Sequence, residues 1–325
     1  MPNFEPIKRI GMDNKDFVSE INRLKKEKNA VIMAHYYQAD EVQEIADFIG
    51  DSLALAQQAA KTDAKLLVVC GVLFMGETAK ILSPGKKVLI PDLQAGCSLA
   101  DSCPSDEFEA FIKLYPDHKV VTYVNTTAAV KALTDIVVTS TNAVSIIESF
   151  PKEQPILFGP DRNLGNYLNS ITGRNMVLWD GACHVHEQFS VEKIYELKQA
   201  HPNAMIIAHP ECKEVLLKMA DYIGSTAALL NYTQQSDNTE FIVATESGIL
   251  HEMRRLSPTK VFIPAPPNDS TCACNECSFM RLNTLKKLYM CLLNEAPEVL
   301  IDENIRIKAE VPIRKMLDLS NKLKL

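Results

Sequence analysis

Ala30-Val31-Ile32-Met33-Ala34-His35 is a short apolar run that ends in a polar ring, and the chain repeats this pattern twice. The copies are Lys119-Val120-Val121-Thr122-Tyr123 and Ala204-Met205-Ile206-Ile207-Ala208-His209, and their final rings follow at intervals of 88 and 86 residues. Each run is followed by a helical pattern, a second apolar run, another helical pattern and a third apolar run. Repetition at a nearly fixed interval indicates one structural unit present in three copies.

Alternating strand and helix patterns are typical of βαβ units with a buried parallel sheet. The sequence therefore predicts an α/β fold of three homologous three-layer α/β/α domains with parallel sheets, arranged with pseudo-threefold symmetry around a central active site. We place the first repeat, with an N-terminal helix, at 1–108, the second at 109–194 and the third at 195–282. We expect the helical tail, 283–325, to pack back on the first repeat.

The composition argues against several classes of protein. The 325 residues carry a formal net charge of -7 without a cluster of Lys and Arg, so we expect no nucleic acid partner. The sequence has no run of 18 apolar residues and no apolar signal core in Met1–Met12, so we expect no membrane span and a cytoplasmic location. In that compartment the nine cysteines would be metal ligands, redox groups or packing residues rather than disulfides.

One cysteine follows the last apolar run of each repeat, and the three are Cys97, Cys183 and Cys277. Parallel strands end at one edge of a sheet, so these loops can converge on a common point. Thiolates bind zinc and iron–sulfur clusters, and three cysteines on a four-iron cluster would leave one iron open as a Lewis acid. Zinc bound by three cysteines and a histidine is the alternative, with His184 and His186 as possible ligands.

The other cysteines do not share this repeat position. Cys272-x-Cys274-x-x-Cys277 could form a small metal knuckle or contain a redox pair, but only Cys277 of these three matches the repeat. The remaining cysteines are interpreted as packing residues: Cys70, Cys103, Cys212 and Cys291.

Small polar residues open helical patterns at equivalent places in the three repeats, at Ser52, Ser140 and Thr226. Such residues commonly cap helices, and a helix N-terminus also attracts anions through its free N–H groups. Three helix ends that face one cavity would bind carboxylates or a phosphate without a basic patch.

Further polar side chains at the strand ends are candidates for proton transfer and orientation: His35, Tyr37, Tyr123, Asn125, His209 and Glu211. Histidine titrates near neutral pH, and burial can raise the pKa of glutamate toward that range. Glu211 follows His209-Pro210 directly, so these residues form a compact acid–base pair.

Several motifs, in order, resemble those of the quinolinate synthase family, and the likeness extends from about residue 20 to about residue 320. They are His35-Tyr36-Tyr37-Gln38, Gly50-Asp51-Ser52-Leu53, Phe74-Met75-Gly76-Glu77-Thr78-Ala79-Lys80-Ile81-Leu82, Gly96-Cys97-Ser98-Leu99-Ala100, Tyr123-Val124-Asn125-Thr126, Trp179, His209-Pro210-Glu211 and Gly224-Ser225-Thr226. The resemblance implies a triplicated α/β fold around a [4Fe-4S] cluster, with Cys97, Cys183 and Cys277 as cluster ligands.

The resemblance also implies an activity, namely condensation of iminoaspartate (iminosuccinate) with dihydroxyacetone phosphate to give quinolinate, phosphate and water on the route to NAD. The implied substrate site contains His35, Ser52, Tyr123, Asn125, Ser140, His209, Glu211 and Thr226. Glu211, His209, Tyr37 and Tyr123 would be catalytic, and the open iron would act as Lewis acid. The expected partners are the two substrates, with functional coupling to the enzyme that makes iminoaspartate.

Two other functions remain as alternatives. One is a different open-iron dehydratase on the same scaffold. The other is a metal or redox sensor that uses Cys272, Cys274 and Cys277 alone.

Overall fold

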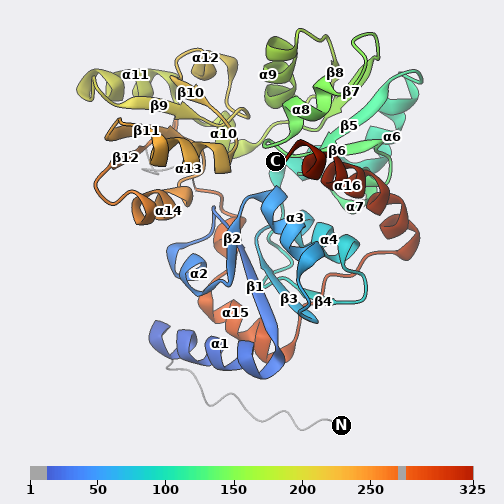
Figure 1. The fold of residues 1–325 in the computed structure, drawn as a ribbon, viewed down its shortest axis with the longest axis vertical. Coiled ribbons are helices and arrows are strands. Elements are labelled where there is room, and N and C mark those ends of the chain that lie inside the picture. The colour runs from blue at the N-terminus through green and yellow to red at the C-terminus, as the bar shows by residue number, and fades with distance from the viewer. Residues whose placement is uncertain (1–12, 270–275, 325) are drawn as a thin grey trace.

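The computed structural model describes residues 13–269 and 276–324 of the chain. Its strands form three four-stranded parallel sheets, each flanked by helices, and the three resulting units lie around a common centre. Figure 1 shows the first unit in blue, the second in green and the third in yellow to orange. The predicted α/β fold of three homologous repeats is therefore confirmed, while the exact domain boundaries stay a prediction.

The three sheets share one topology, in which the first strand of the unit lies between the second and the third. The strands of the first unit are β1 (Ala30–His35), β2 (Phe48–Gly50), β3 (Leu66–Cys70) and β4 (Lys87–Leu89), in the order β2-β1-β3-β4. Those of the second are β5 (Lys119–Tyr123), β6 (Ile136–Val138), β7 (Ile156–Gly159) and β8 (Val177–Leu178), in the order β6-β5-β7-β8. Those of the third are β9 (Met205–Ala208), β10 (Tyr222–Ile223), β11 (Glu240–Ala244) and β12 (Val261–Pro264), in the order β10-β9-β11-β12.

The sequence pattern predicts only three strands in each unit, because β2, β6 and β10 are two or three residues long. So short a strand shows no periodicity. Each of these strands is recognisable only by its pairing with the first strand of its unit, for example through Met33 opposite Phe48.

Helices precede the first strand of each unit and connect the later ones. They are α1 (Asn14–Lys28), α2 (Asp40–Ile45), α3 (Ser52–Lys61), α4 (Leu73–Leu82) and α5 (Ser98–Asp101) in the first unit; α6 (Ser105–Lys113), α7 (Ala128–Lys131), α8 (Ala143–Glu148), α9 (Arg162–Thr172) and α10 (His184–Glu187) in the second; α11 (Val191–Ala200), α12 (Glu214–Leu217), α13 (Thr226–Gln235) and α14 (Ile249–Leu256) in the third. Among the residues described, no helix is both long and apolar enough to cross a lipid bilayer.

The first unit shows why its sheet is covered on both faces. Side chains alternate along a strand, so Met33 faces the core shared with α3 and α4, whereas Ile32 and Ala34 face the core shared with α1 and α2. Burial on both faces explains why the strands are continuous apolar runs rather than alternating ones.

One aspartate in each unit joins the first strand to the segment before the second. Asp47, Asp135 and Asp221 each accept a hydrogen bond from a backbone N–H of the first strand, at 2.8, 2.9 and 2.8 Å. Each aspartate also returns a backbone N–H to the carbonyl of that same strand residue. This aspartate recurs at intervals of 88 and 86 residues and is a structural residue that anchors the edge of the sheet.

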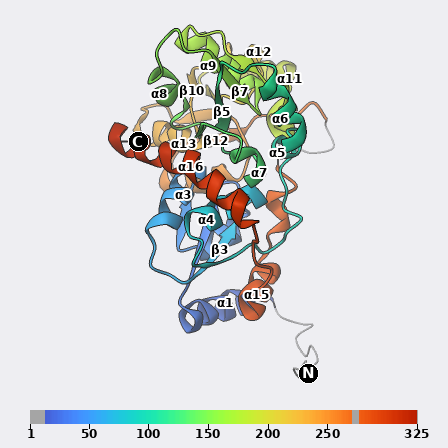
Figure 2. The ribbon, with the colours of Figure 1, turned by 90° about the vertical axis from the view of Figure 1, so that its right-hand side faces the viewer.

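The tail contributes the 3₁₀ turn Met280–Leu282, α15 (Leu285–Asn294) and α16 (Glu303–Leu323). Helix α15 packs beside α1 of the first unit, whereas α16 lies across α7 and β6 of the second unit and α4 of the first. Figure 2 shows α16 crossing in front of these elements. The sequence pattern predicts the helices, but it does not specify that α16 contacts two units.

Replacing Asp221 with Ala removes the acceptor for the buried N–H of Ile206 and should lower the free energy of unfolding by about 1–3 kcal/mol. Denaturant unfolding of the two proteins measures the difference. Asp237→Ala removes an exposed carboxylate of the same unit and is the control. If both variants unfold at the same denaturant concentration, the proposed anchoring role of Asp221 is wrong.

Candidate active site

A cavity at the centre of the molecule is lined by residues from all three units. Its walls contain every site residue that the sequence predicts: His35, Tyr37, Ser52, Cys97, Tyr123, Asn125, Ser140, Cys183, His209, Glu211, Thr226 and Cys277. These residues follow strands whose carboxyl ends point to the centre, so the fold itself brings them together.

The three repeat cysteines approach the cavity from equivalent loops. Cys97 lies directly before α5 and Cys183 directly before α10, while Cys277 lies three residues before the 3₁₀ turn that begins at Met280. All three are free thiols, partly buried, and they line the same cavity. A shared metal site requires its ligands to converge, and these three cysteines line one cavity although they are far apart in the sequence.

The surroundings of these thiols disfavour a bare thiolate. Burial raises the pKa of Cys97 to about 12, and it also raises the pKa of Cys183 and of Cys277. Negative neighbours add to this effect. A thiolate at Cys277 and the carboxylate of Glu211 would both raise the pKa of Cys97. A bound cation or cluster would reverse this balance by stabilising the thiolates.

A closer group of potential ligands is formed by Cys183, His186 and Glu211, whose ligand atoms all lie within 4.8 Å of one another. His184, the other histidine considered for zinc, instead directs Nδ1 to the hydroxyl of Ser98 at 2.7 Å. Of the two histidines, only His186 lines the cavity.

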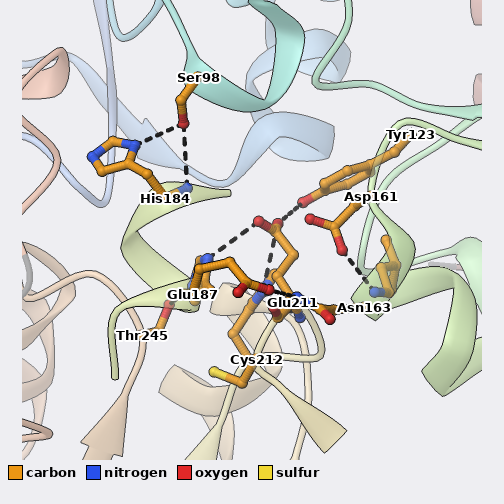
Figure 3. A network of polar contacts seen from close by, with 12 residues as sticks. Ser98, Tyr123, Asp161, Asn163, His184, Glu187, Glu211, Cys212 and Thr245 are labelled. Atoms are coloured by element: carbon orange, nitrogen blue, oxygen red, sulfur yellow. Dashed lines mark hydrogen bonds and ion pairs between the residues drawn. The ribbon is translucent and has the colours of Figure 1, made fainter. Parts of the chain in front are cut away.

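Glu211 is the centre of a buried polar network (Figure 3). The hydroxyl of Tyr123 donates to Glu211 Oε1 at 2.7 Å, His209 Nδ1 lies 3.6 Å from the same oxygen, and His186 Nδ1 lies 3.2 Å from Oε2. Burial alone would raise the pKa of Glu211, but His186, His209 and the Tyr123 hydroxyl together hold it below its ordinary value. Glu211 is therefore a carboxylate that faces two imidazoles and a phenol.

The network continues from Glu211 to Tyr37 of the first unit. His186 Nε2 lies 3.1 Å from the hydroxyl of Thr245, which lies 2.7 Å from the hydroxyl of Tyr37. Tyr37 also contacts the hydroxyl of Thr226 at 2.8 Å. A chain of polar contacts thus connects Tyr123, Glu211, His186, Thr245 and Tyr37, and its link from His186 Nδ1 to Glu211 is a close approach without hydrogen-bond geometry.

Two residues of this chain, His186 and Thr245, are absent from the predicted proton-transfer set. The sequence offers His186, beside Cys183, only as a possible zinc ligand. Nothing in the sequence around Thr245 distinguishes it from a packing residue, and its contact with Tyr37 crosses from the third unit to the first.

The ring residues at the ends of the first strands are kept uncharged. Burial lowers the pKa of His35 and of His209 to about 3, so both are neutral imidazoles at neutral pH. Burial also raises the pKa of Tyr37 and Tyr123 well above the ordinary value of 10.0. These groups are hydrogen-bond donors and acceptors without net charge.

Ser52, Ser140 and Thr226 are not the N-cap residues of their helices, so the capping interpretation is wrong. Asp51 caps α3 by accepting from Ala54 N at 2.9 Å, and Ser225 caps α13 by accepting from Ala228 N at 3.2 Å. Ser52 and Thr226 are the first helical residues instead, and Ser140 lies three residues before α8. Asp and Ser both cap helices well, so composition alone does not show which of two neighbours is the cap.

Residues from the three units meet at these helix ends. The hydroxyl of Thr141, in the second unit, lies 2.7 Å from Asp51 Oδ2 in the first unit and 2.9 Å from Ser225 Oγ in the third. The Thr141 hydroxyl can donate its one proton either to the carboxylate or to Ser225 Oγ. This contact joins the starts of α3 and α13 across the cavity.

Some buried polar atoms on the cavity wall have no hydrogen-bond partner among the described residues. They include Asn125 Oδ1 and Thr139 Oγ1. Because a buried polar atom without a partner is costly, such atoms favour a polar ligand that would satisfy them.

A family model described as quinolinate synthetase A protein matches residues 19–318. A protein from Thermosynechococcus vestitus named quinolinate synthase is 58% identical over 305 residues, covering 94% of this chain and 96% of its own length. Proteins of the same name from Trichormus variabilis and Chloroherpeton thalassium are 60% and 55% identical, covering 94% and 96% of this chain and 94% and 97% of their own lengths.

The depressed pKa values of His35 and His209 predict a loss of stability in acid. An unfolded chain binds a proton at each ring below the ordinary pKa of 6.5, whereas the folded chain does not until the pH approaches about 3. Between these values, unfolding therefore takes up protons, and stability should fall by about 1.4 kcal/mol per pH unit for each histidine.

The variant His35→Gln should reduce this slope in urea unfolding of the metal-free chain between pH 6.5 and pH 4. His201→Gln, in which the replaced side chain is 38% exposed, is the control. An unchanged slope in His35→Gln would show that His35 is not held neutral by the fold.

Proposed function

The chain belongs to the quinolinate synthetase A family, whose members act in NAD biosynthesis, and from this premise we propose the reaction that it performs. The enzyme condenses iminoaspartate (iminosuccinate) with dihydroxyacetone phosphate to give quinolinate, phosphate and water. The observation that carries the proposal is the single cavity in which the twelve predicted residues meet.

The cavity offers neutral donors and acceptors to substrates that bring two carboxylates and a phosphate. Ser52 and Thr226 are the first residues of α3 and α13, so their free backbone N–H groups and the helix dipoles favour anions. Ser140, Asn125 and His35 add side-chain partners on the same wall. Helix N-termini and neutral donors of this kind would bind the anionic substrates in the absence of a basic patch.

Proton transfer is assigned to the chain of groups around Glu211. The carboxylate accepts a proton from a substrate carbon or nitrogen, and His209 and Tyr123 orient it. His186 and Thr245 connect it toward Tyr37, which would return a proton to the substrate. Because ring formation needs proton removal and proton delivery at different atoms, one relay with two ends suits the reaction.

The donor set also fits an iron–sulfur cluster bound by Cys97, Cys183 and Cys277. A single zinc ion requires ligands at about 2.0–2.3 Å, and the compact group around His186 contains only one of the three cysteines. The spread of the three thiols therefore favours a larger group such as [4Fe-4S]. When bound by three cysteines, that cluster supplies an iron with an open position, a Lewis acid for the loss of a substrate hydroxyl.

The substrate chemistry also supports functional coupling to an enzyme that supplies iminoaspartate. An imine hydrolyses in water, so direct delivery would protect it. The buried walls of the cavity would protect the bound imine in the same way.

The direct test is anaerobic purification, iron and sulfide counts, and an assay with both substrates. We expect iron in each chain and a product with the absorbance of a pyridine dicarboxylate. Iron-loaded protein that consumes both substrates without forming quinolinate would instead support another open-iron dehydratase.

Glu211→Gln should lower turnover at least a hundredfold while leaving the iron content unchanged, because an amide cannot accept the proton. Single-turnover assays and iron counts measure the two effects. Glu214→Gln, which changes a 72% exposed side chain on the neighbouring helix α12, is the control. Turnover near that of the control would show that Glu211 is not the proton acceptor.

Cys97→Ser should abolish iron retention, since it removes one of three protein ligands to the cluster. Cys103→Ala, at a buried thiol that does not line the cavity, should retain iron. A sensor that uses Cys272, Cys274 and Cys277 alone would keep its metal in Cys97→Ser. Cys272 and Cys274 lie outside the described residues, so iron counts decide between these functions.

A further inference from the structure

Two buried carboxylates stand at equivalent positions in the second and third units. Asp161 lies two residues after β7, and Glu246 lies two residues after β11. Their exposed fractions are 0% and 1%, and neither is part of the proton relay described above. Buried carboxylates are costly, so a shared position in two repeats calls for a shared role.

Each carboxyl group lies beside the backbone of the repeat cysteine in its own unit. Cys277 N donates to Glu246 Oε1 at 3.1 Å. The backbone N–H of Cys183 lies close enough to the carboxyl of Asp161 to lower its pKa, but burial is the larger effect and raises that pKa well above its ordinary value. Burial raises the pKa of Glu246 to about 7, so its carboxyl group accepts the bond from Cys277 N without carrying a full charge at neutral pH. A buried acceptor at this position restricts the backbone from which the thiol projects.

Both carboxylates are themselves held by the start of the following segment. Asp161 Oδ1 accepts from Leu164 N at 2.7 Å and thereby caps α9. Glu246 Oε2 accepts from Gly248 N at 2.7 Å. These bonds hold each acceptor in place beside its cysteine loop.

In the first unit, other contacts hold the loop that carries the repeat cysteine. Val72, which is 2% exposed, occupies the equivalent position two residues after β3 and cannot accept a hydrogen bond. There the loop is held by a main-chain bond from Leu73 N to Ala95 O at 2.7 Å. Ser98, next to Cys97, also contacts His184, next to Cys183, as Figure 3 shows.

Arg281 connects Glu246 to the first unit. Its Nη2 lies 3.2 Å from Glu246 Oε1, and its Nη1 donates to the carbonyl of Tyr37 at 3.0 Å. Glu246, beside Cys277, is thus linked through Arg281 to the backbone of Tyr37.

We propose that Asp161 and Glu246 are positioning residues that hold the backbones of Cys183 and Cys277 in the geometry that binds the metal cluster. The inference rests on the proposed cluster role of these cysteines. It adds a pair of carboxylates, used in two units and replaced in the third, whose task is to present thiols rather than to contact substrate.

The test compares the iron-loaded full-length enzyme with its variants Asp161→Asn and Glu246→Gln. Iron release to a chelator under anaerobic conditions should be about tenfold faster in each variant, as is usual when a partner of a metal ligand is lost. Asn is also a good helix cap, so Asp161→Asn leaves α9 intact. Glu252→Gln, at a buried carboxylate of α14 that pairs with Arg255, is the matched control and should release iron at the wild-type rate.

A second measurement separates positioning from a general structural role. After iron removal, Asp161→Asn should have a thermal midpoint no lower than that of the wild-type chain, because Asn still caps α9 and adds no buried charge. A fall in the midpoint parallel to the loss of iron would overturn the proposal, and so would wild-type iron release in both variants. If Cys97→Ser itself retained iron, the cluster assignment would fail; if it lost iron while both carboxylate variants kept it, only the present inference would fail.

Discussion

The direction of parallel strands is the constraint on which this molecule depends. In each unit four parallel strands end at the same edge of the sheet, and the three edges face one centre. Any residue that follows a strand is therefore placed near the centre, whatever its distance along the chain. Asp47, Asp135 and Asp221 support this arrangement, since each joins the first strand to the turn before the second.

A cavity built in this way is stable only if its buried polar groups satisfy one another. Tyr123 and His186 of the second unit meet Glu211 of the third, and Tyr37 of the first meets Thr245 of the third. No unit contains a complete relay, so the proton-transfer network exists only when the units are packed together. The contacts that pack the units together are thus also the contacts proposed to transfer protons.

The sequence predicts this site well because its signals are repeated, and it fails where a signal occurs once or is too short. The apolar runs and the following polar residues recur three times, so the sheets and the twelve cavity residues could be predicted. The strands β2, β6 and β10 are too short to show a pattern, and Ser52 and Thr226 stand beside the true caps, Asp51 and Ser225. Asp161 and Glu246 share a position, but Val72 breaks the threefold pattern there, so the repeat does not reveal them.

The differences between the units are as important as their likeness, because two unlike substrates must bind in one cavity. Identical units would present three identical walls. Instead, the first strands end in His35, Tyr123 and His209, and the third strands are followed by Val72, Asp161 and Glu246. Cations also differ: Lys131, fully buried, faces Glu77 and lies in the field of Cys97, and burial lowers its pKa to about 8. Arg281 instead pairs with Glu246 beside Cys277. A common backbone therefore supplies the convergence, and divergence at a few strand ends gives each wall its own charge and hydrogen-bonding character.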